Sequence, residues 1–188
     1  VLLESNPAAN CKVRIDEILD LRAGNFIAAS DISPESDEEH QIPCFGGGGI
    51  RGYVPASNQE GDLVLIGRQG ALCGNVKRAN GKFYATEHAV VVTPKADADI
   101  RWVFHLLTNM DLNQYASKSA QPGLAVGTLN KLEIDVPSVE DQIRVGAVLD
   151  KFDALVNDLS IGLPAELNAR RKQYEYYRDK LLVFNGTN

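Results

Sequence analysis

Short apolar runs separated by turn residues characterise the chain from residue 1 to residue 137. The segments "DLVLIG" (62–67) and "HAVVVTP" (88–94) are rich in β-branched residues and are bounded by Gly, Asp, His or Pro. Runs of this kind are typical of buried strands. Asn80-Gly81 lies between Val76 and Phe83, and it predicts a two-residue hairpin turn, because a type I′ turn needs positive φ at both central residues.

A helix is predicted within "DADIRWVFHLLTNM" (97–110), with Asp99 as its N-cap. The segment "DLNQYASKS" (111–119) predicts a further short turn or two of helix, and "LEIDV" (132–136) alternates like a strand. No sustained alternation of strands with helices is present, so a parallel sheet is not expected. The pattern predicts an α+β fold, a mixed globular domain with short strands and glycine-rich loops.

After Pro137 the pattern changes to that of one long helix. Ser138 and Asp141 have the spacing of a capping box, with Asp in place of the usual Glu. Apolar and aromatic residues then follow heptad steps up to Leu163 and again from Leu167. Because a stutter in the repeat and Pro164 coincide, we expect this helix to be kinked or broken near 162–164.

A continuous helix of this length would extend for ~70 Å, far more than the preceding domain needs for its own core. The apolar stripe therefore predicts pairing with a partner helix, and the alternative is a helix folded back on the first domain. The residues expected to make this dimerisation contact are Leu149, Phe152, Val156, Leu159, Leu167, Tyr174, Tyr177 and Leu181.

The composition, with 44% hydrophobic and 23% charged residues, is that of an ordinary globular protein. No apolar run approaches the ~20 residues that cross a bilayer, and the N-terminus lacks the features of a signal peptide. The chain has no initiator Met, which fits a processed or excised piece. Three cysteines at unpatterned spacing argue against a disulfide framework and favour a reducing cytoplasm.

Enzymatic and metal motifs are mostly missing. The glycine run at 46–49 is not followed by Gly-Lys-Ser/Thr, so a phosphate loop is not indicated. His40 and Cys44 are four residues apart, but no second pair has zinc-finger spacing, and no metal site is expected. Cys44 or Cys73 could in principle form a catalytic pair with His88. Three histidines and three cysteines yield such combinations by chance, so this pair is not indicated. We expect no catalytic residues.

The net charge of −6 at first disfavours nucleic acid as a partner, but residues 44–95 carry an excess of basic groups. Three loops in this chain place a basic residue beside glycines: "GGGGIRGY" (46–53), "GRQGALCG" (67–74) and "SKSAQPGLAVG" (117–127). Glycine allows backbone N–H groups to reach phosphate oxygens, and Arg pairs with phosphate or with guanine. Each loop alone is more simply a tight turn, and the coincidence of three favours contact with a large anion.

The order of these motifs resembles the specificity subunit of type I restriction–modification systems. The likeness is carried by "IPCFGGGGIRGYV", "LVLIGRQGALCGNV", "GKFYATEHAVVV" and the segments from 112 to 184. It implies a target recognition domain over 1–137, which reads one half of a split DNA sequence, and a conserved helical spacer over 138–188. The candidate DNA-binding residues are Gly47, Gly48, Arg51, Tyr53, Arg68, Gln69, Lys77, Arg78, Lys118 and Gln121.

The family subunit has two recognition domains and two spacer helices, whereas this chain has one of each. It is therefore either a half subunit or a fragment of a longer chain. A half subunit would form a homodimer or pair with a second recognition half. The resemblance implies double-stranded DNA as a partner, together with methylation subunits and, through them, restriction subunits. It implies no cofactor on this chain, since S-adenosylmethionine and ATP belong to the partner subunits. A second hypothesis is an assembly or decoy protein that acts through helix pairing alone.

Overall fold

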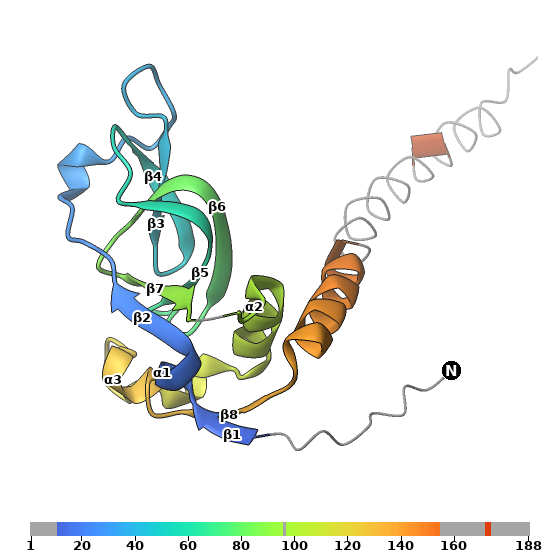
Figure 1. The fold of residues 1–188 in the computed structure, drawn as a ribbon. Coiled ribbons are helices and arrows are strands. Elements are labelled where there is room, and N and C mark those ends of the chain that lie inside the picture. The colour runs from blue at the N-terminus through green and yellow to red at the C-terminus, as the bar shows by residue number, and fades with distance from the viewer. Residues whose placement is uncertain (1–10, 96, 155–171, 174–188) are drawn as a thin grey trace, which may run out of the picture. The chain divides into compact units, whose positions relative to one another are not determined.

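The structure is a computed structural model that describes residues 11–95, 97–154 and 172–173 (Figure 1). Its strands are β1 (Cys11–Arg14), β2 (Leu19–Ala23), β3 (Ile42–Gly46), β4 (Gly49–Val54), β5 (Gln59–Gly67), β6 (Val76–Ala85), β7 (Ala89–Pro94) and β8 (Glu133–Val136). Its α-helices are α1 (Ile15–Ile18), α2 (Ile100–Asn109) and α3 (Val126–Leu129), with 3-10 turns at Ala29–Asp31 and Leu112–Tyr115. A further helix runs over 139–154.

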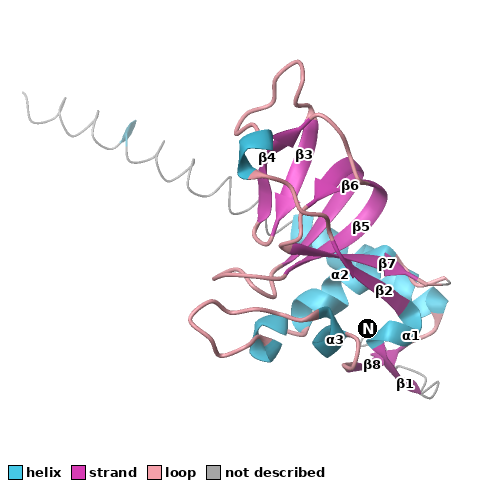
Figure 2. Ribbon diagram, turned by 90° about the vertical axis from the view of Figure 1, so that its left-hand side faces the viewer, coloured by secondary structure: helices cyan, strands magenta, loops and turns pink. Residues whose placement is uncertain are grey.

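Six strands form one mixed sheet in the order β2-β7-β5-β6-β3-β4, and β1 pairs with β8 in a separate ribbon. The β3–β6 pair is parallel, whereas the other pairs are antiparallel. Figures 1 and 2 show α1, α2 and α3 gathered near the end of the sheet that holds β2 and β7, with β3 and β4 at the other end. The expected α+β class is confirmed.

The hydrophobic core forms two clusters. The larger one joins α2 to strands β2, β5 and β7 and includes the buried side chains of Val64, Val92 and Leu107. The smaller one is built around Phe83, whose ring packs edge-on against that of Phe45 with 5.6 Å between centroids. The predicted strands at 62–67 and 88–94 both contribute residues to these clusters, because their runs of β-branched residues are buried.

The predicted hairpin at Asn80-Gly81 is wrong. β6 passes through both residues without a turn, and Gly81 lies directly opposite Gly61 of β5. Both glycines have positive φ, at 81° and 119°, so the pair allows the two long strands to bend together. The Asn-Gly signal therefore marks a bend in a continuous ladder.

The helix after Pro137 begins as its sequence predicts. Ser138 Oγ accepts a hydrogen bond from the backbone N–H of Asp141 at 3.2 Å and donates one to the Asp141 carboxylate at 2.8 Å. Gln142 is buried, accepts from the backbone N–H of Asp99 at 3.0 Å and donates to the Pro137 carbonyl at 3.0 Å. The first turns of this helix are therefore bonded to the start of α2.

Two compact units divide the chain, Val1–Ala147 and Val148–Asn188. On the predicted heptad stripe, Val145 is 39% exposed, Phe152 is 60% exposed and Leu149 is half-buried. The other predicted dimerisation residues and the expected kink lie outside the described residues: Val156, Leu159, 162–164, Leu167, Tyr174, Tyr177 and Leu181. Within the part of the chain that the structure describes, no helix is long and apolar enough to cross a membrane.

Asp99 caps α2 as predicted, since its carboxylate accepts from the backbone N–H groups of Arg101 at 3.0 Å and Trp102 at 3.1 Å. Burial acts to raise the pKa of Asp99, but hydrogen bonds from Arg101 and Trp102 outweigh it and the pKa lies below its ordinary value. We expect Asp99→Ala to lower the free energy of unfolding by about 1 kcal/mol at neutral pH.

A carboxyl whose pKa is lowered in the folded state stabilises the fold above its unfolded pKa of about 4, and this contribution disappears as the pH falls through the folded value. Thermal unfolding followed by circular dichroism should therefore show a melting difference between wild type and Asp99→Ala that shrinks below pH ~4. Exposed Asp97 supplies the matched control, and Asp97→Ala should melt like wild type. A difference independent of pH would contradict the capping role.

Candidate functional site

The four glycines Gly46–Gly49 form the tight turn between β3 and β4. A side chain on Gly67, at the end of β5, would collide with the carbonyl oxygen of Gly47, so the two backbones touch. A side chain on Gly47 would in turn come within 3.2 Å of the carbonyl oxygens of His88 and Gln69. Gly49 differs, since its surroundings are open and its φ of 123° is what requires glycine. The first part of the turn therefore rests on the domain's own backbone.

The loop at 67–75 is closed by hydrogen bonds between its own ends. The Gly67 N–H donates to the Asn75 carbonyl and the Gly74 N–H donates to the Gly67 carbonyl, each at 2.8 Å. Gly74, with φ of 85°, packs so closely on Asn113 that no side chain would fit there. The ends of this loop are held rigidly, and Gln69 to Leu72 form its exposed or half-buried part.

Arg68 joins this loop to two others through its backbone. Its N–H donates to the His88 carbonyl at 2.8 Å, and its carbonyl accepts from the Leu124 N–H at 2.8 Å. Gly70 also donates to the Pro122 carbonyl at 3.0 Å. The three glycine-bearing loops predicted from the sequence are therefore brought together, although they are separated by up to about 75 positions in the chain.

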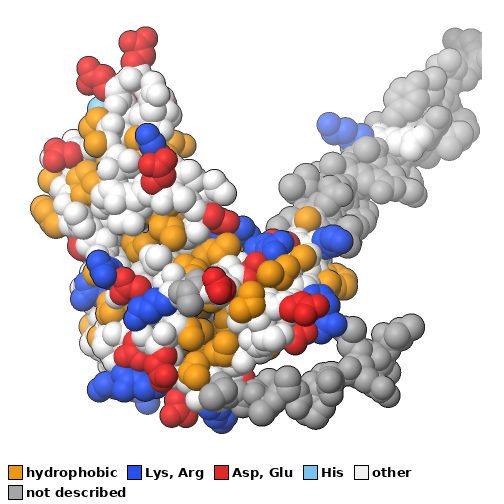
Figure 3. Space-filling view, in the orientation of Figure 1, with side chains coloured by type: hydrophobic (Ala, Val, Ile, Leu, Met, Phe, Trp, Pro, Cys, Tyr) orange, Lys and Arg blue, Asp and Glu red, His pale blue; other side chains and the backbone are white. Residues whose placement is uncertain are grey.

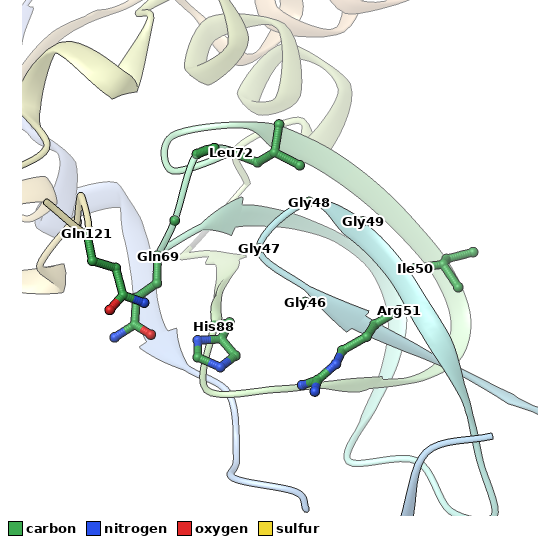
Figure 4. A pocket seen from close by; sticks show the side chains of 12 residues that line it. Gly46, Gly47, Gly48, Gly49, Ile50, Arg51, Gln69, Leu72, His88 and Gln121 are labelled. Atoms are coloured by element: carbon green, nitrogen blue, oxygen red, sulfur yellow. The ribbon is translucent and has the colours of Figure 1, made fainter. Parts of the chain in front are cut away.

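A hollow of about 570 Å³ lies where these loops meet (Figure 4). In Figure 4 the polar ends of Gln69, Gln121, His88 and Arg51 lie on one side of the glycine turn, and Leu72 lies on the other. The lining residues are Gly46, Gly47, Gly48, Gly49, Ile50, Arg51, Gln69, Gly70, Ala71, Leu72, His88 and Gln121.

The lining contains no carboxylate, although acidic residues outnumber basic ones in the chain. Arg51 is exposed and makes no ion pair with another residue that the structure describes. Its guanidinium therefore presents a full positive charge and five N–H donors. Such a surface suits an anion or the acceptor edge of a base.

His88 is positioned by its neighbour Glu87. The imidazole Nε2 lies 3.1 Å from Glu87 Oε1, and the His88 N–H is 3.3 Å from the Thr86 hydroxyl. Glu87 Oε2 is buried and has no hydrogen-bond partner among the described residues. The carboxylate fixes the ring at the edge of the hollow without itself lining it. The sequence suggested His88 only as a possible partner in a Cys–His pair, and His88 was not among the candidate DNA-binding residues.

Acidic side chains gather elsewhere, at the tip of the loop that leads into β3 (Figure 3). This loop contains Asp37, Glu38 and Glu39, all of which are exposed, and the Asp37 carboxylate accepts from the His40 backbone and ring. These backbone and side-chain hydrogen bonds of His40 lower the pKa of Asp37. The acidic segment is a solvated loop, and its charge would repel a polyanion.

The candidate residues predicted from the sequence divide into two sets. Those that line the hollow are Gly47, Gly48, Arg51, Gln69 and Gln121, and those that do not are Tyr53, Arg68, Lys77, Arg78 and Lys118. The sequence-based prediction missed Leu72 and Ile50, whose large exposed side chains lie beside the glycines. No signal in the sequence marked them, because only the folded loops show that these side chains remain exposed.

The candidate residues that do not line the hollow make other contacts within the domain or are exposed elsewhere. The Arg78 Nε donates to Asp62 across the β5–β6 ladder at 2.7 Å, so its guanidinium already has a partner. Tyr53 exchanges backbone hydrogen bonds with Ser33 at 2.7 and 2.9 Å. The Arg68 side chain reaches the Glu87 carbonyl at 3.5 Å. Lys77 and Lys118 are exposed.

The described cysteines are not arranged for nucleophilic chemistry. Cys44 and Cys73 are 0% and 2% exposed, and burial raises the pKa of both thiols. A buried protonated thiol is a poor nucleophile. Among the described residues, no three His, Cys, Asp or Glu side chains are grouped so as to hold a metal ion.

Comparisons with known proteins identify the family of this chain. The chain is 58% identical over 146 residues to the Escherichia coli type I restriction enzyme EcoprrI specificity subunit, covering 78% of this chain and 36% of that protein. It is 34% identical over 154 residues to a putative type I specificity subunit of Haemophilus influenzae, covering 78% of this chain and 40% of that protein. The chain thus spans well under half the length of these relatives.

Solved structures share the fold. A type I restriction–modification S subunit from M. genitalium matches with a TM-score of 0.71 at 21% identity, covering 98% of this chain and 49% of that one. The HsdS subunit from Thermoanaerobacter tengcongensis matches with a TM-score of 0.60 at 21% identity, covering 82% of this chain and 41% of that one. The family model described as the type I restriction modification DNA specificity domain matches residues 9–169. The chain therefore belongs to the family of type I restriction–modification DNA specificity domains.

Proposed function

We propose that this chain recognises one half-site of a split DNA target and directs methylation and restriction subunits to it. As a specificity domain the chain is non-catalytic. S-adenosylmethionine and ATP would act on the partner subunits, and the complex would work in the cytoplasm. The E. coli relative is named as the specificity subunit of a type I restriction enzyme, which supports a place in such a complex.

The observation that carries this proposal is the composition of the hollow. The three glycine-bearing loops present one arginine and two amides there, and the turn before β7 adds one histidine, with no carboxylate in the lining. Gln pairs with the N6 and N7 edge of adenine, and Arg with the O6 and N7 edge of guanine. Although the net charge of the chain is −6, the acidic loop lies outside the lining of this hollow. No carboxylate of the lining would therefore repel the phosphates of DNA.

The residues assigned to direct base reading are Arg51, Gln69 and Gln121, supported by close approach at Gly47 and Gly48. Lys118, Lys77 and Arg68 would contribute at the phosphate backbone, where charge suffices. Tyr53 and Arg78 rank last. Neither lines the hollow, and the Arg78 guanidinium is already bonded to Asp62.

The second candidate function is assembly or exchange through the helix, without productive DNA reading. The exposed apolar side chains of Val145 and Phe152 favour it, because they recur at heptad spacing. Helix pairing is compatible with the first proposal, as a homodimer or as a pair with a second recognition half. Size-exclusion chromatography with light scattering, with and without the methylation subunit, distinguishes monomer, homodimer and heteromer.

The deciding experiment is selection of DNA sites from a randomised duplex pool by the 188-residue chain, followed by anisotropy titration across salt concentrations. We expect a defined half-site to emerge, with an affinity that falls as salt rises because phosphate contacts release counterions. Failure to enrich any sequence, while the chain still associates with methylation or specificity subunits, would replace the first function with the second.

A further inference from the structure

Leu72 is a large apolar side chain exposed at a site that is otherwise polar or glycine-rich. It is 56% exposed and lines the hollow, together with Ile50 at 59%. An isolated exposed leucine is ordinary on a protein surface. Two such side chains, in the lining of a hollow that also holds the donors assigned to base edges, are better explained by a ligand with an apolar group.

The backbone holds Leu72 in place. The Cys73 N–H donates to the Gly70 carbonyl and the Asn75 N–H donates to the Leu72 carbonyl, each at 3.0 Å. The Leu72 side chain leans over the glycine turn, and its Cδ1 occupies the space that a side chain on Gly48 would need. The leucine is thus fixed by its own loop and braced by the facing turn, so it would lose little conformational freedom on binding.

We propose that Leu72 recognises the C5-methyl group of thymine in the major groove. This inference rests on the proposed DNA-reading function and names a base that the site selects. The methyl group is the apolar feature of the major-groove edge, and it distinguishes thymine from cytosine. Gln69 lies three residues before Leu72 in the same loop and lines the same hollow, so a site that pairs the amide with adenine would bring Leu72 close to a base of the same half-site.

An alternative is that Leu72 acts as a wedge between base steps. Wedges enter the minor groove, unstack the bases and kink the duplex. Leu72 instead lies against Gly48, and the neighbouring Gln69, Gln121 and Arg51 have their specific pairing partners in the major groove. The positions of these side chains favour contact with a methyl group.

The test uses the 188-residue chain and the duplex selected as its half-site. Each thymine is replaced in turn by uracil, which lacks the C5-methyl group and leaves the base-pairing edge unchanged. At one or two of these positions, we expect uracil to lower the affinity of the wild-type chain for DNA by about fourfold. This factor corresponds to the free energy of burying one methyl-sized group. Leu72→Ala should bind thymine DNA about fourfold more weakly, and it should lose nothing further at that position with uracil.

Phe26→Ala is the matched control, because Phe26 is 76% exposed, apolar and outside the lining of the hollow. It should keep the wild-type response to uracil. The proposal is overturned if the selected site holds no thymine, if wild type ignores uracil at each thymine, or if Leu72→Ala stays sensitive to uracil. Equal weakening on both duplexes with reduced DNA bending would identify a wedge instead. Enrichment of no site at all would count against the proposed function itself.

Discussion

Arg51→Ala is expected to weaken binding to the selected half-site by about tenfold or more, with little change in the melting temperature. Arg51 is exposed on β4, lines the hollow and has no ion-pair partner among the described residues. Its removal therefore costs the fold little. A bidentate contact of Arg with guanine is worth about 1–3 kcal/mol, and a phosphate contact would lower the salt slope by about 0.9. Anisotropy titrations at several salt concentrations measure both quantities.

Arg51→Lys separates the two kinds of contact, because lysine keeps the charge but lacks the planar fork. Near-wild-type affinity for Arg51→Lys would indicate phosphate, whereas a loss as large as that of Arg51→Ala would indicate a base. Arg22→Ala is the charge-matched control, since Arg22 is 80% exposed on β2, at the other end of the sheet order from β4. If Arg51→Ala and Arg22→Ala bind equally well, Arg51 does not contact DNA.

Gly67→Ala should lower the free energy of unfolding by about 3 kcal/mol or more, the largest effect on stability that we expect. A methyl group on Gly67 would overlap the carbonyl oxygen of Gly47 and lie 2.5 Å from that of Leu72. Neither backbone atom can rotate away, so the loop at 67–75 or the turn at 46–49 must move. Because domains are stable by only about 5–15 kcal/mol, urea unfolding should show a much lower midpoint.

Gly127→Ala is the matched control for this substitution. Gly127 is exposed within α3, and no atom lies within 4 Å of the place that its methyl group would take. Alanine there should be neutral or stabilise by about 0.5–1 kcal/mol. If Gly67→Ala unfolds at the same urea concentration as Gly127→Ala, the close contact between the two backbones is not present in solution.

The elements that were predicted correctly are those fixed by local contacts, between residues that lie close together in the chain. Asp99 begins α2 and Ser138 begins the helix at 139 because each side chain bonds a backbone group two or three positions away. The Asn80-Gly81 signal failed for a tertiary reason. Gly61, twenty positions earlier, supplies a second glycine opposite Gly81, and the pair bends a long ladder where a turn is otherwise favoured.

The site was predictable in its loops and not in its individual side chains. Glycines beside basic residues indicated the three loops, since local composition carries that signal. Arg78 looked as available as Arg51 in the sequence, but its partner Asp62 lies sixteen positions away on the adjoining strand. Leu72 was overlooked for the converse reason, because only the folded loop shows that this side chain remains exposed.

The hydrogen bonds between Gln142 and the start of α2 determine where recognition modules can be exchanged. A chimera joined at 137 would pair the Asp99 N–H with a residue from another protein. A poor match would leave that partly buried N–H without a hydrogen-bond acceptor. A chimera joined after Ala147 would transfer the helix start together with its partners on α2. The tenth residue after Pro137, rather than the first, is therefore the natural position for a recombination junction.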